Sequence, residues 1–127
     1  ECYNEAFKSL ADSGKIELPV IPEGCVHNAH MFYIKCRDLE ERTKFISFMK
    51  EHGIGCVFHY IPLHSALAGV KFGRFYGDDK FTIKYSERLV RLPLWYGMTA
   101  ADVETVISTM KSFGVYKNCV LIKIVLE

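Results

Sequence analysis

The segment His59-Tyr60-Ile61-Pro62-Leu63-His64 brings two imidazoles and a phenol together in a short stretch of chain. Imidazole and phenol groups can hydrogen-bond sugar hydroxyls and phosphate oxygens, so the pattern is typical of a substrate or cofactor contact. The segment follows an apolar run, and Pro62 predicts a turn at the end of a strand, where α/β folds place their sites. The residues leave an alternative equally open, in which Tyr60 and His64 satisfy buried backbone groups of a kinked loop.

A second group, Cys25, His27 and His30, has side chains that can bind a metal. Structural zinc sites usually combine two pairs of such ligands at characteristic spacing, and no second pair follows here. We therefore expect hydrogen-bonded histidines and no metal site.

Nucleophilic and phosphate-binding motifs are incomplete. Cys56 and His59 lie three positions apart on a predicted strand, so their side chains should point to opposite faces. Gly69, Gly73 and Gly77 are spaced by fours with bulky residues between them, unlike GxGxxG or the P-loop. The sequence thus contains no complete catalytic constellation.

The composition narrows the classes of protein and of partner. A length of 127 residues with 50% hydrophobic and 24% charged residues fits one globular domain. The 16 basic and 15 acidic residues leave no cationic excess for a nucleic-acid partner. Five irregularly spaced cysteines favour reduced thiols and a cytoplasmic location. We expect no membrane partner, because no apolar run approaches the roughly 18 residues of a span.

The elements that position these residues follow from periodicity and capping. Asp38 with Glu41, and Thr99 with Asp102, have the capping-box spacing that begins a helix. Alternation of helices and strands predicts a two-layer α/β sandwich. The expected elements are helix 1–11, extended segment 16–22, strand 30–36, helix 38–53, strand 55–60, structured loop 64–80, helix 81–90, short extended segment 91–94 and helix 99–114. The second helix should end at Gly53 in a left-handed conformation. The apolar side chains expected on one face are Tyr3, Ala6, Phe7, Leu10 and Ala11 in the first helix, and those expected to point inward are Leu39, Phe45, Ile46 and Met49 in the second and Val103, Val106, Ile107, Met110 and Phe113 in the last.

The tail, residues 115–127, differs in character from the rest of the chain. Val120–Leu126 is apolar except for Lys123, so it should pair with a sheet edge, join a partner or be disordered. Its origin stays open among native, out-of-frame and vector-derived sequence. At its N-terminal end, the chain begins inside an amphipathic helix. This predicts that the part of the protein against which the helix packed, or from which it continued, is missing.

Three segments carry a resemblance to a known family. Residues 27–34 read HNAHMFYI, residues 58–64 read FHYIPLH and residues 86–96 read SERLVRLPLWY. In this order and spacing they resemble the C-terminal part of the DegT/DnrJ/EryC1/StrS sugar aminotransferases. The resemblance runs from about Glu1 to Phe113.

The resemblance implies the type I fold of aminotransferases that depend on pyridoxal phosphate (PLP). Residues 1–114 would be the small C-terminal α/β domain, and a missing N-terminal large domain would bind PLP through a lysine Schiff base. Two subunits would share each active centre as a homodimer. The implied reaction moves an amino group, typically from glutamate, to a nucleotide-linked 4-keto-6-deoxyhexose.

The roles that the resemblance gives to this chain are few. The Schiff-base lysine, the acidic partner of the pyridine nitrogen and the phosphate-binding residues belong to the large domain. We therefore expect no catalytic residue and no bound cofactor here. His59, Tyr60 and His64 match the family's strand-end motif on the substrate side, and His30 matches a recurrent histidine of the preceding strand. The alternative is a free-standing α/β module that binds a nucleotide sugar or a protein without catalysis.

Overall fold

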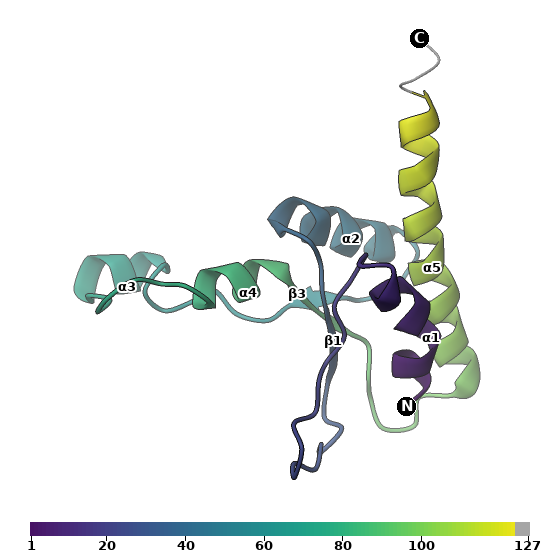
Figure 1. Ribbon diagram of the computed structural model, residues 1–127, viewed down its shortest axis with the longest axis horizontal. Coiled ribbons are helices and arrows are strands. Elements are labelled where there is room, and N and C mark those ends of the chain that lie inside the picture. Colours follow the sequence, from purple (N-terminus) through teal and green to yellow (C-terminus); the bar gives the residue numbers. More distant parts are fainter. Residues whose placement is uncertain (124–127) are drawn as a thin grey trace.

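Within the residues that the structure describes, the chain forms five helices and one small sheet of three strands (Figure 1). The computed structural model describes the backbone of residues 1–123 and the side chains of residues 1–114. The elements are α1 (Cys2–Asp12), β1 (Phe32–Lys35), α2 (Leu39–Glu51), β2 (Val57–Phe58), α3 (Leu67–Phe72), α4 (Thr82–Arg88), β3 (Leu89–Leu92) and α5 (Ala100–Lys123).

The sheet has the strand order β1-β3-β2, and both neighbouring pairs are antiparallel. Val90 of the central strand lies opposite Ile34 on one side and Phe58 on the other. The prediction of a helix through residue 90 followed by an extended segment 91–94 was wrong at its boundary. β3 begins at Leu89, because pairing with strands on both sides fixes an extended backbone there.

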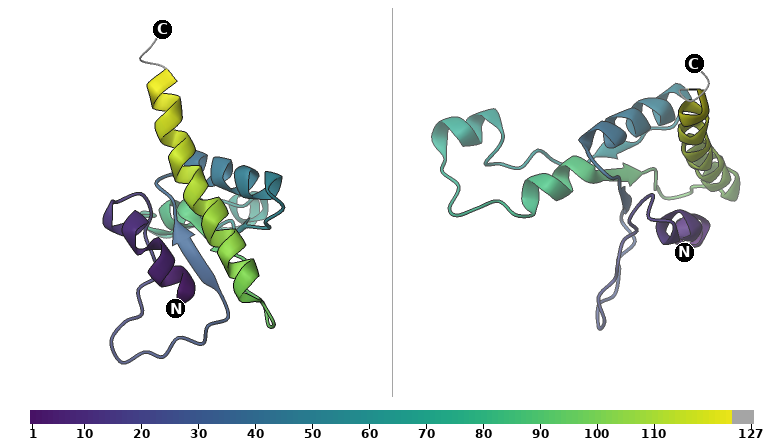
Figure 2. Two further views of the ribbon diagram at one scale, coloured as in Figure 1. Left: turned by 90° about the vertical axis from the view of Figure 1, so that its right-hand side faces the viewer. Right: turned by 45° about the horizontal axis from the view of Figure 1, so that its top comes forward.

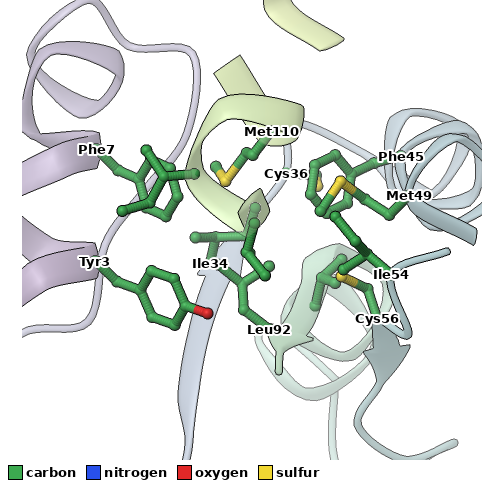
Figure 3. Close-up of a cluster of buried hydrophobic side chains, with 13 residues drawn as sticks. Tyr3, Phe7, Ile34, Cys36, Phe45, Met49, Ile54, Cys56, Leu92 and Met110 are labelled. Carbon is green, nitrogen blue, oxygen red and sulfur yellow. The ribbon is translucent and has the colours of Figure 1, made fainter. Parts of the chain in front are cut away.

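Helices α1, α2 and α5 cover one face of the sheet. The hydrophobic core lies between these helices and the sheet (Figures 1 and 3). Ile34 and Val90 of the sheet, Phe7 of α1 and Met49 of α2 have no exposed surface. Met110 of α5 closes the same cluster. The predicted two-layer α/β architecture is confirmed, as are the inward faces of α1 and α5.

The predicted starts of two helices are confirmed by their caps. Asp38 Oδ1 accepts a hydrogen bond from the Glu41 amide at 2.8 Å, and Thr99 Oγ1 accepts one from the Asp102 amide at 3.2 Å. Side-chain acceptors at these positions satisfy amide groups that the first helical turn leaves free. At the far end of α2, Gly53 has the left-handed φ of 75° that the sequence predicted.

The prediction that the last helix ends at Gly114 was wrong. Gly114 is not among the glycines with positive φ, and the helical backbone of α5 continues to Lys123. A glycine inside a helix costs only about 1 kcal/mol, so without a left-handed turn it does not end the helix. The backbone of the tail is therefore helical as far as 123, and the predictions for 124–127 lie outside the described residues.

Residues 59–81, here called the arm, project away from the sheet (Figures 1 and 2). The predicted structured loop 64–80 contains the short helix α3, which the sequence did not indicate because none of its residues is buried. At Gly69 an ideal Cβ would lie 1.6 Å from the carbonyl oxygen of Leu63. Only glycine permits this close approach between α3 and the turn before it.

Within the part of the chain that the structure describes, no helix has the length and apolar character needed to cross a bilayer.

Candidate functional site

The predicted motif, residues 59–64, leaves the sheet directly after β2 and enters the arm. The strand expected at 55–60 is shorter than predicted, because only Val57 and Phe58 pair with β3. The turn predicted at Pro62 is present, and the Pro62 carbonyl accepts hydrogen bonds from the amides of Ser65 and Ala66 at 3.1 and 3.0 Å.

His64 is held by Asp79, an acidic residue close to the end of the arm that leads into α4. Its Nε2 lies 2.6 Å from Oδ2 of Asp79. Only 18% of the His64 side chain and 11% of the Asp79 side chain are exposed. The ring of Phe75 lies against the imidazole, with 4.3 Å between centroids. The imidazole is therefore fixed in position and in orientation.

Asp79 is also the acceptor that begins α4. Its Oδ1 accepts from the amides of Thr82 at 2.7 Å and Phe81 at 3.1 Å, and its Oδ2 from that of Ile83 at 3.1 Å. Burial by itself would raise the pKa of Asp79, but these bonds and the contact with His64 outweigh it and lower the pKa. The ionised carboxylate can only accept, so His64 donates from Nε2, and Nδ1 is the acceptor of the neutral ring.

His59 and Tyr60 lie side by side at the base of the arm. Their ring centroids are 4.4 Å apart in an edge arrangement. Nδ1 of His59 is buried and has no hydrogen-bond partner among the described residues, while 68% of Tyr60 is exposed. The Tyr60 carbonyl accepts from Oγ of Ser86 at 2.6 Å, which anchors the backbone. This leaves the Tyr60 phenol at the surface, free to contact a ligand.

The alternative in which Tyr60 and His64 satisfy buried backbone groups is not what the structure shows. The His64 side chain bonds a carboxylate. In the described part of the chain, the Tyr60 hydroxyl makes no hydrogen bond to a backbone group.

His30 lies at the opposite end of the sheet from the 59–64 motif. It sits in an exposed loop ahead of β1, and its Nδ1 lies 2.6 Å from Oδ1 of Asn28. The register sets Phe32 opposite Leu92, whereas β2 ends at Phe58 opposite Val90. Since β1 and β2 both run antiparallel to β3, the start of β1 points away from the end of β2. The structure does not bring the four predicted contact residues into one site.

Asp79 is the site residue that sequence reasoning missed, because it fell inside the predicted loop. A local signal was available: an aspartate three positions before the helical residue Thr82 has the spacing of a capping acceptor.

Neither a group of metal ligands nor a buried lysine with a free amine is found among the described side chains. No group of three His, Cys, Asp or Glu residues within them lies close enough to hold a metal ion. Among the lysines whose side chains are described, only Lys35 is not exposed, and its Nζ lies 2.5 Å from Oε2 of Glu17. A Schiff-base lysine needs a free amine inside a cofactor pocket, and Lys35 does not offer one.

Comparison with models of protein families finds a match over most of the chain. The model of the DegT/DnrJ/EryC1/StrS aminotransferase family matches residues 1–111. An uncharacterised protein of Methanocaldococcus jannaschii is 35% identical over 113 residues, which cover 86% of this chain. The chain spans only 28% of that relative's length.

Solved structures of aminotransferases share the fold. The aminotransferase TlmJ from Streptoalloteichus hindustanus has a TM-score of 0.75 at 20% identity, covering 92% of this chain and 31% of that one. NtdA from Bacillus subtilis, solved with bound cofactor PMP, has a TM-score of 0.67 at 23% identity, covering 87% of this chain and 25% of that one. At these identities the likeness describes the fold alone.

Proposed function

Because the chain belongs to the DegT/DnrJ/EryC1/StrS aminotransferase family, we propose that residues 1–114 are the small C-terminal domain of a PLP-dependent nucleotide-sugar aminotransferase. Residues 115–127 form the tail beyond that domain. One observation carries the proposal: the family match runs from residue 1 to 111, yet the chain spans only 28% of its curated relative. The missing catalytic lysine belongs to the large domain.

The reaction that we propose for the whole enzyme transfers an amino group from glutamate to a dTDP-4-keto-6-deoxyhexose. We propose this substrate because segments 27–34, 58–64 and 86–96 resemble those of dTDP-4-amino-4,6-dideoxygalactose transaminases. This sugar would serve lipopolysaccharide or other surface-polysaccharide synthesis, and the enzyme would act in the cytoplasm. The reduced thiols that the cysteine pattern predicts agree with that compartment.

In this proposal the strand-end motif supplies contacts to the substrate. The exposed phenol of Tyr60 offers a hydrogen bond to a sugar hydroxyl or phosphate oxygen. His64, oriented by Asp79, would present Nδ1 as an acceptor for a sugar hydroxyl. His59, at the base of the arm, would support the contacts that Tyr60 and His64 make with the substrate. His30, at the other end of the sheet, would contact a different part of the substrate.

The arm supports the presence of partners, namely the large domain and a second subunit of a homodimer. Its large apolar side chains are left open to solvent, among them Leu63 at 86%, Leu67 at 93%, Phe72 at 79% and Tyr76 at 97%. Apolar patches of this kind mark interaction surfaces. A free-standing module would bury or replace them, so the exposed arm disfavours that alternative.

Borohydride trapping tests the assignment of the chemistry. We expect that the 127-residue chain, mixed with PLP and reduced, shows only scattered low-yield labelling of its exposed lysines by peptide mass spectrometry. Stoichiometric trapping at one lysine would refute the placement of the Schiff-base residue in the large domain.

Calorimetry with a dTDP-sugar separates the two functions. An isolated small domain should bind it with a dissociation constant of about 1 mM or not at all, whereas a sensor module should bind at about 1 μM. The reading frame upstream of Glu1 gives a second test: an α/β domain with a strand-end lysine supports the aminotransferase, and an independent start codon supports the module.

A further inference from the structure

A groove of about 300 Å³ lies between α2, α4 and the first residues of the arm. This volume is at the lower end of the range for small-molecule sites. Apart from Tyr60 at its edge, the groove uses none of the residues assigned to the sugar substrate. Its lining consists of Leu39, Arg42, Phe58, Tyr60, Ile61, Pro62, Ser65, Ile83, Ser86 and Glu87.

Two opposite charges line this groove without pairing with each other. Arg42 donates from Nη1 to the Ser86 carbonyl at 3.0 Å, and its guanidinium lies 5.1 Å from the centroid of the Phe58 ring. Its Nε is buried and has no hydrogen-bond partner among the described residues. Glu87 is half-buried, and its carboxylate makes no hydrogen bond or ion pair within the described part of the chain.

Other charges near the sheet do pair. Lys35 and Arg88 both contact the carboxylate of Glu17, for example. A half-buried charge without a partner is unfavourable, because it loses hydration without compensation. Arg42 and Glu87 therefore offer, within one cavity, a cation for a ligand's anionic group and an anion for its cationic group.

Apart from Ser65 and Ser86, the remaining lining of the groove consists of apolar and aromatic side chains. Leu39 was predicted to point into the core, but it is 41% exposed and lines the groove instead. Ile61 is 62% exposed, and the partly buried Ile83 also lines the groove. These side chains suit an apolar group on the ligand.

We propose that this groove binds a free α-amino acid with an apolar side chain. Arg42 holds the carboxylate, Glu87 holds the ammonium group, and Leu39 and Ile61 contact the side chain. The charge complementarity within one cavity selects this ligand over a sugar, which carries no ammonium group, and over a simple anion, which leaves Glu87 unpaired. The site is independent of the proposed aminotransferase reaction.

The test is an NMR titration of the 15N-labelled 127-residue chain with L-leucine. We expect saturable amide shifts at Ser65, Ile83 and Glu87. N-acetyl-L-leucine, which lacks the ammonium charge, and L-leucinamide, which lacks the carboxylate, should each bind about tenfold more weakly or worse. Equal binding of either analogue, shifts confined to other regions, or no shifts at the solubility limit of leucine would overturn the proposal.

Substitutions of Glu87 and Arg42 test which charge on the ligand each residue holds. Glu87→Gln should weaken leucine binding about tenfold, whereas Glu104→Gln, an exposed carboxylate on α5, should leave it unchanged. Arg42→Gln also removes the bond to Ser86, so Arg42→Lys is included to keep the cation, and it should retain more affinity than Arg42→Gln. Wild-type affinity in Glu87→Gln would refute the ammonium contact. Because the readout is direct binding, failure here leaves the aminotransferase proposal untouched.

Discussion

Nε2 of His64 lies 2.6 Å from Oδ2 of Asp79, and this contact joins the two ends of the arm. His64 lies in the turn after β2, and Asp79 precedes α4. The same carboxylate caps α4 through three amides, so one side chain both begins a helix and orients an imidazole. The geometry of the candidate site therefore depends on a carboxylate whose two oxygens already accept bonds from within the chain.

Asp79→Ala should loosen the arm. It removes the acceptor of three amides at the start of α4 and the partner of His64. We expect faster amide hydrogen exchange in residues 64–88, with the core strands little changed. Asp78→Ala is the matched control, since Asp78 is exposed and makes no interaction in the described part of the chain. Equal exchange in the two variants would contradict the role of Asp79.

The stabilisation by Asp79 should depend on pH. Because folding lowers the pKa of this carboxyl, its contribution is complete above the ordinary aspartate pKa of about 3.9 and is lost as pH falls through the lower folded pKa. The difference in unfolding free energy between wild type and Asp79→Ala should be constant near neutrality and shrink in acid. Urea melts across pH measure it, and a difference that grows in acid would have the wrong sign.

Gly69→Ala should displace α3. A Cβ at this position would lie 1.6 Å from a backbone carbonyl oxygen, so the backbone must move. Overpacking of this kind costs about 1–3 kcal/mol. Gly55→Ala is the control, because a Cβ there meets nothing within 4 Å and the backbone is not left-handed. Thermal melts and amide shifts of the arm measure the effect; unchanged shifts near Leu63 would contradict it.

The cysteines should differ sharply in reactivity. Burial raises the pKa of the Cys56 thiol to about 12, so it holds almost no thiolate at neutral pH. Cys2 and Cys25 are exposed. With iodoacetamide, peptide mass spectrometry should show early modification of Cys2 and Cys25 and protection of Cys56 until the chain unfolds. Modification of native Cys56 as fast as Cys25 would show that the core around β2 is open.

Local signals in the sequence were sufficient for the starts of α2 and α5 and for the buried faces of α1 and α5. The spacing of Tyr3 and Phe7, and of Val106 and Met110, predicted the faces that the structure buries. Helical periodicity and capping act over a few residues, so they can be read without the rest of the fold. The same holds for the 59–64 motif, whose place after a strand followed from an apolar run and a proline.

Pairing between distant segments decided the rest. Leu89–Leu92 is the central strand of the sheet because two strands from elsewhere in the chain pair with it. The types of these four residues do not by themselves indicate that position. The same topology sends His30 to the far end of the sheet from His64. It also brings Arg42 of α2 and Glu87 of α4 to one groove, 45 positions apart in sequence. Local patterns report a residue's neighbours in the chain; hydrogen bonding across the sheet sets its neighbours in space.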